Sequence, residues 1–82
     1  MSTPFLAAFA DTVVVRLVAD RQLELAPGGE ARAVLFVANW LGTHARGGSL
    51  LSSLEAALLA CPEVVELYAD VDRLKALVDD LA

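Results

Sequence analysis

The sequence predicts an all-α fold, a small bundle of five to six helices that forms a single domain over residues 1–82. Apolar residues recur at a spacing near 3.6 in every long apolar segment, whereas strict alternation occurs only at Leu23–Leu25. The hydrophobic share of 57% consists mainly of Ala, Leu and Val, which suit closely packed helices. Because 82 residues can build only one small core, part of this apolar surplus is expected at an interface.

The first helix is predicted to begin at Thr3-Pro4, where a capping hydroxyl precedes proline at the first helical position. The run Val13–Val15 would suit a strand, but the spacing over the whole segment favours a helix. Its apolar positions recur every fourth residue: Phe5, Phe9, Val13 and Leu17. Leu23–Leu25 alternates and is predicted to be a short extended connector, closed by the turn residues 26–29.

A second helix is predicted from about Glu30 to Leu41, ending at Gly42. It is apolar almost all round, so we expect it to be the central helix of the bundle. Ser49 is placed to cap a third helix, which Pro62 ends. The apolar positions of this third helix are Leu50, Leu51, Leu54, Leu58 and Cys61.

The last segment carries a heptad pattern with Val at every a position and Leu at every d position. Such a helix presents one apolar seam and suits a parallel two-stranded partner. The seam residues are candidate interface residues: Val64, Leu67, Val71, Leu74, Val78 and Leu81. Alternatively, the seam packs inside the bundle. In either case Val71 and Leu74 are expected to be buried, and Asp70 either caps a separate last helix or lies within one long helix.

Phe36 and Trp40 lie four residues apart on the second helix, on the side that Arg32 shares. Both could be core residues. The alternative is an aromatic contact patch, because Trp and Arg are enriched at binding hot spots. Phe36 and Trp40 are therefore also candidate interface residues.

The charge pattern argues against several partners. The net charge is −5, and the excess lies in residues 47–82, which hold seven acids and two bases. Nucleic acids are bound by clustered Lys and Arg, and the sequence has no such cluster. The most apolar stretch, Ala33–Leu41, has about half the length needed to span a bilayer. With one cysteine and no basic signal-peptide region, the protein is expected to be cytoplasmic, without a nucleic-acid or membrane partner.

The sequence pattern does not predict a catalytic, metal-binding or cofactor-binding site. Gly42–Ser49 comes within one residue of a phosphate-binding loop, but Gly48 stands where that motif has Lys, so a glycine-rich connection between helices is the alternative. His44 is the only histidine, and Cys61 lies on an apolar helix face where a thiol is inert. One His and one Cys cannot form a zinc site. We therefore expect no catalytic residues, no metal and no cofactor.

The segment from residue 40 to 68 resembles the closing half of the bacterial effector-associated, death-like domains. The resemblance rests on Ala45-Arg46-Gly47 followed by a Leu-rich helix, a proline and another Leu: Leu50, Leu54, Leu58, Pro62 and Leu67. It implies a six-helix death-like fold that joins its own kind and links a sensor to an effector in bacterial conflict or immunity systems.

The sequence thus predicts a non-catalytic protein–protein interaction module, an adaptor whose partner is a second copy or a like domain. The alternative is an obligate structural homodimer zipped through the C-terminal helix, with no signalling role. A third possibility is a ligand-binding or regulatory protein that uses the Gly42–Ser49 loop.

Overall fold

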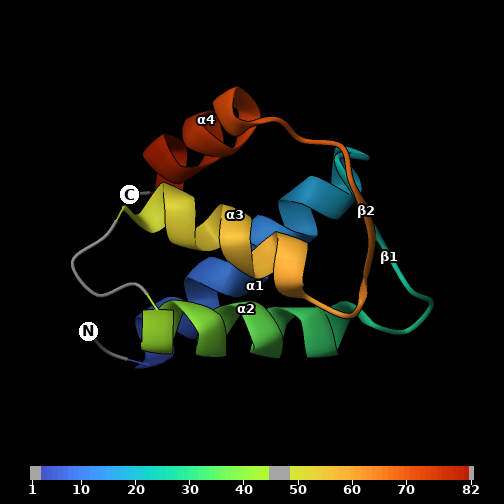
Figure 1. The fold of residues 1–82 in the computed structure, drawn as a ribbon, viewed down its shortest axis with the longest axis horizontal. Helices are drawn as coiled ribbons and strands as arrows, with labels where there is room; N and C mark the ends of the chain where they lie inside the picture. Colours follow the sequence, from blue (N-terminus) through green and yellow to red (C-terminus); the bar gives the residue numbers. More distant parts are fainter. Residues whose placement is uncertain (1–2, 45–48, 82) are drawn as a thin grey trace.

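The computed structural model describes residues 3–44 and 49–81. In chain order its elements are α1 (Thr3–Ala19), β1 (Leu23–Leu25), α2 (Glu30–His44), α3 (Leu50–Ala60), β2 (Val64–Leu67) and α4 (Val71–Leu81) (Figure 1). The prediction of a mostly helical protein is confirmed. The prediction of five to six helices is wrong, because the described residues form four helices and one two-stranded sheet. The six-helix arrangement implied by the resemblance is likewise not formed by these residues.

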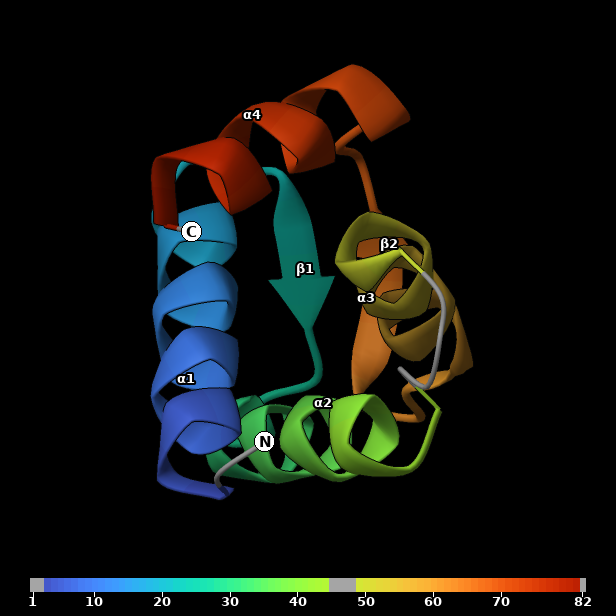
Figure 2. The same cartoon turned by 90° about the vertical axis from the view of Figure 1, so that its left-hand side faces the viewer.

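The helices are stacked so that α4 and α2 lie on opposite sides of the molecule, with α1 and α3 between them (Figures 1 and 2). The two strands pair with each other, and β1 contacts α1 while β2 contacts α3. Apolar side chains from all four helices and from β1 form one core cluster. The outer faces of α2 and α4 are therefore the faces that no other helix covers in these views.

Helix α1 contributes most to the core. Its buried residues follow helical spacing: Leu6, Phe9, Ala10, Val13, Val14 and Leu17. Val13–Val15 is therefore helical as predicted, with Val15 left on the exposed side. Helix α1, and not α2, contributes the largest number of buried residues to the bundle.

Helix α2 differs from the prediction in two ways. It runs through Gly42 to His44, because an isolated glycine costs a helix only about 1 kcal/mol and does not break it. Its buried residues form one stripe, namely Ala33, Val37 and Leu41. Leu35, two residues after Ala33 and therefore about 200° around the helix, is 64% exposed. The prediction that α2 is the central helix is wrong.

The two strands join distant parts of the sequence. Leu23 pairs with Leu67 and Leu25 with Val64, which leaves Val65 as a bulge without a partner. The carbonyl of Gln22 accepts hydrogen bonds from the amides of Tyr68 and Ala69. Leu23–Leu25 is extended as predicted. The helix predicted over 64–67 is wrong, because Val64, Glu66 and Leu67 pair with β1 instead, in a segment whose β-branched valines favour a strand.

Helices α3 and α4 both begin at a capping side chain. The Ser49 hydroxyl accepts a hydrogen bond from the Ser52 amide at 3.4 Å, which confirms the predicted cap of α3. The Asp70 carboxylate accepts one from the Arg73 amide at 2.8 Å. Asp70 therefore caps a separate last helix, which was one of the two alternatives.

Candidate interaction surfaces

The residues of the predicted C-terminal seam are divided between strand β2 and helix α4. Leu74 and Val78 are buried in the core of this same chain. Val64, Leu67 and Leu81 are half-buried against that core. Val71 is 48% exposed, so its predicted burial is not found within the chain. Because β2 and α4 are separate elements, these six residues do not form one continuous helical face.

Phe36 and Trp40 are neither core residues nor fully exposed. Both are half-buried, and their rings stack with centroids 5.8 Å apart. The His44 ring continues the row, stacked on Trp40 at 4.1 Å. Successive rings of this row are one helical turn apart along α2. Trp40 packs against the core. The three rings form an aromatic edge along the C-terminal part of α2.

The predicted Gly42–Ser49 loop is shorter than expected. Gly42, Thr43 and His44 belong to α2, and Ser49 caps α3. Residues 45–48 lie outside the described residues. They include Gly48, the position on which the phosphate-binding hypothesis depends.

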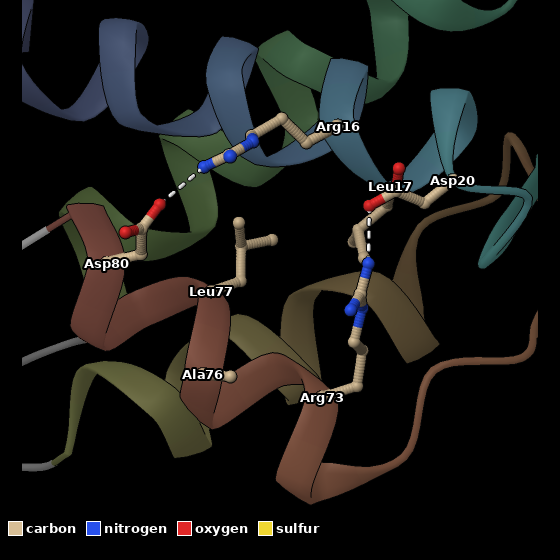
Figure 3. Close-up of a pocket in the computed structure, with 7 residues that line it drawn as sticks. All are labelled: Arg16, Leu17, Asp20, Arg73, Ala76, Leu77 and Asp80. Atoms are coloured by element: carbon tan, nitrogen blue, oxygen red, sulfur yellow. Dashed lines mark hydrogen bonds and ion pairs between the residues drawn. The ribbon is translucent and has the colours of Figure 1, made fainter.

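A shallow groove between α1 and α4 is bridged by two ion pairs (Figure 3). Arg16 pairs with Asp80 at 2.8 Å, and Arg73 pairs with Asp20. Leu77 points into the space between the two ion pairs (Figure 3). All four charged side chains are about half exposed or more, so each pair stabilises the fold by less than about 1 kcal/mol. This groove therefore already has its charged partners within the chain.

Tyr68, the residue that directly follows β2, has a shifted pKa. The Tyr68 hydroxyl donates a hydrogen bond of 3.1 Å to Glu24 Oε1. This bond, then the negative charge of Glu24, with smaller contributions from desolvation and from Glu66, raises the pKa of Tyr68 above its usual value. The phenol therefore stays protonated and acts as a hydrogen-bond donor that ties β2 to β1.

The surface that sequence reasoning missed lies between α1 and α2. We call it the α1/α2 groove; it is lined by Asp11 of α1 and by four residues of α2, namely Glu30, Ala31, Val34 and Leu35. Leu35 is 64% exposed. Val15, which is 42% exposed, lies one helical turn after Asp11 on the same face of α1. The groove thus combines contiguous apolar side chains with two carboxylates.

A signal for this groove was present in the sequence. A helix that is apolar all round must expose part of its apolar surface when the domain is too small to surround it. The sequence shows the excess on residues 30–41 but not which face stays outside. That choice depends on where α1 and α3 lie against α2.

The charges of the groove have no partner within the described chain. The four ion pairs among the described residues join Arg16 with Asp80, Arg32 with Glu63, Arg73 with Asp20, and Lys75 with Asp79. None of these pairs uses Asp11 or Glu30. Glu30 lies in the first turn of α2, where the helix dipole favours a negative charge. Asp11 lies in the middle of α1, where no such effect applies.

The candidate chemical residues are not brought together. His44 ends α2 and Cys61 follows α3, and the two helices run in opposite directions (Figure 1). The two ends of α3, which has 11 residues, are roughly 16 Å apart, and Cys61 follows its far end. Cys61 is also buried. Among the described residues, no three His, Cys, Asp or Glu side chains gather as a metal site requires.

The helices of the described chain are too short or too polar to cross a bilayer. Comparison with protein-family models, with curated proteins and with solved structures finds no significant match to this chain. The candidate site is therefore inferred from the geometry and charge of the chain's own residues.

Proposed function

We propose that this protein is a non-catalytic protein–protein interaction module that docks a partner through the α1/α2 groove. The observation that carries the proposal is the exposure of Leu35 beside Val34 and Ala31, on a helix whose opposite side is fully buried. A single exposed leucine is ordinary in a folded protein. An apolar groove between two helices with charges at its margin has the composition of an interface centre and its rim.

The alternative of a homodimer zipped through the C-terminal helix receives less support. Its central residues would be Leu74 and Val78, which already pack inside the chain. Freeing them for a partner would expose core surface and leave a cavity, at a cost of several kcal/mol. Val71 alone remains on the outside of that seam, so we place the interface on α1 and α2.

The proposal can be tested by site-specific photo-crosslinking in the cells from which the protein comes. A photoreactive phenylalanine analogue at position 35 should give a discrete protein adduct, which mass spectrometry identifies. Leu59 on α3 is a matched control, because it is also a leucine and is 69% exposed. The same analogue at position 59 should give no defined adduct. Circular dichroism verifies that both substituted proteins stay folded.

An equal pattern at the two positions, or no adduct at position 35, would refute docking through the groove. Because both side chains are largely exposed, neither substitution should alter the free energy of unfolding by more than about 0.5 kcal/mol. A negative result could therefore not be attributed to loss of the fold.

A further inference from the structure

We infer that the occupant of the α1/α2 groove is a basic amphipathic helix of a partner protein, with an apolar stripe that covers Leu35 and a Lys or Arg that meets Asp11 and Glu30. This inference rests on the proposed function and names the partner of the same site. It is carried by the combination of an apolar floor and two carboxylates that no ion pair of the described chain uses.

The shape of the groove favours a helix over an extended peptide. Extended peptides gain affinity through main-chain hydrogen bonds to the edge of a sheet. The groove is formed by the middle of α1 and the first half of α2, so it offers helix surfaces and no sheet edge to which a strand could be added. The apolar residues Ala31, Val34 and Leu35 follow the spacing of helical ridges, into which the ridges of another helix can pack.

The charge of the groove argues against a second copy of this chain as the occupant. In a two-fold symmetric pair, the same groove of both copies would meet, which brings Asp11 and Glu30 near the same carboxylates of the other copy. Like charges that face each other across an interface oppose binding. The chain also carries a net charge of −5, which adds a general repulsion between copies. A basic partner is attracted by the same charges.

The ends of the groove set the orientation of the charged residue. Glu30 is the first residue of α2, and the apolar residues follow it toward the C-terminus of that helix. The partner helix should therefore place its Lys or Arg near the beginning of α2 and its apolar stripe along Ala31 to Leu35. Binding should weaken as salt is added, because the carboxylates are exposed to solvent.

Two synthetic peptides provide the test. Both are amphipathic helices about 18 residues long with the same leucine stripe; one carries Arg on its flanks and the other carries Glu at the same positions. Their binding to the ¹⁵N-labelled protein is followed by NMR chemical shifts. We expect the Arg peptide to shift the groove residues and to bind at least tenfold more tightly than the Glu peptide.

Three variants locate the interaction. Leu35→Ser should weaken the Arg peptide about tenfold. The pair Asp11→Asn and Glu30→Gln should weaken it about three- to tenfold. The control pair Glu55→Gln and Asp72→Asn removes two charges from α3 and α4 that take part in none of the ion pairs described above. It should alter the dissociation constant less than twofold.

Equal binding of the two peptides, or equal weakening by both charge pairs, would overturn the basic occupant. If the Arg peptide does not bind, the inference is also overturned. Sedimentation of the protein alone gives a further readout: a dimer that Leu35→Ser abolishes would make a second copy the occupant and overturn the inference. In each of these cases an adduct at position 35 and not at position 59 would still support the groove as a docking site.

Discussion

Replacing Leu74 with alanine should destabilise the protein strongly, whereas replacing Val71 should not. The heptad pattern treats the two residues as equivalent members of one apolar seam. The structure separates them, because Leu74 is completely buried and Val71 is 48% exposed. The pair of substitutions therefore distinguishes the sequence pattern from the tertiary packing.

The magnitude follows from the atoms removed. Leu74→Ala deletes three buried carbon atoms, which are worth about 2.5 kcal/mol in transfer free energy. A cavity beneath α4 raises the cost to about 3–5 kcal/mol. A domain of this size has a free energy of unfolding of roughly 4–12 kcal/mol, so the variant should lose a large part of it. Val71→Ala removes side-chain atoms that are already half in water and should cost less than about 1 kcal/mol.

Thermal and urea unfolding followed by far-UV circular dichroism measure the difference. The melting temperature should fall by more than about 10 °C for Leu74→Ala and by only a few degrees for Val71→Ala. Sedimentation of the wild-type protein over a range of concentrations checks that the effect is intramolecular. Similar losses for the two variants would refute the packing described for α4, and would return the seam to an interface between chains.

Three further measurements test the local structure. Asp70→Ala removes the cap of α4 and should lower the free energy of unfolding by about 0.5–2 kcal/mol in urea titrations, without changing the fold. Tyr68 is the only tyrosine, so its ultraviolet titration reports its pKa directly: it should lie above 10 in the folded protein and move down in Glu24→Gln. Because the folded pKa is raised, the stability linked to Tyr68 is complete below pH 10 and is lost as the pH rises through the folded pKa; a pKa at or below 10 would contradict the bond to Glu24. A double-mutant cycle on Arg16 and Asp80 should give a coupling under about 1 kcal/mol that declines with salt, and a larger, salt-independent value would contradict their exposure.

The helix beginnings could be predicted because their causes are local. At Ser49, the capping side chain and the amide that it accepts from are three residues apart. The same holds for Asp70 and Arg73, although the sequence left open whether Asp70 starts a helix or lies within one. The long run of helical spacing in residues 3–19 likewise outweighed the β-branched Val13–Val15. In each of these cases the decisive signal lies within one continuous stretch of the chain.

The interface could be predicted only in part. The composition showed that the chain has more apolar residues than its interior can hold. Which residues remain outside depends on the packing of whole elements. Leu35 is exposed and Val37 is buried because α1 and α3 cover one side of α2 and leave the other uncovered.

The sequence alone was sufficient to predict the helical class of the protein, the starts of its first three helices and the extended form of Leu23–Leu25. Val64–Leu67 carries a helical repeat but forms a strand, and this outcome depends on tertiary contacts. The strand is stabilised by backbone hydrogen bonds to a segment far away in the sequence, and no window of the sequence contains both partners. The same reason explains why the seam residues differ in burial. Burial is a property of the assembled elements, and the rest of the chain covers Leu74 but leaves Val71 half exposed.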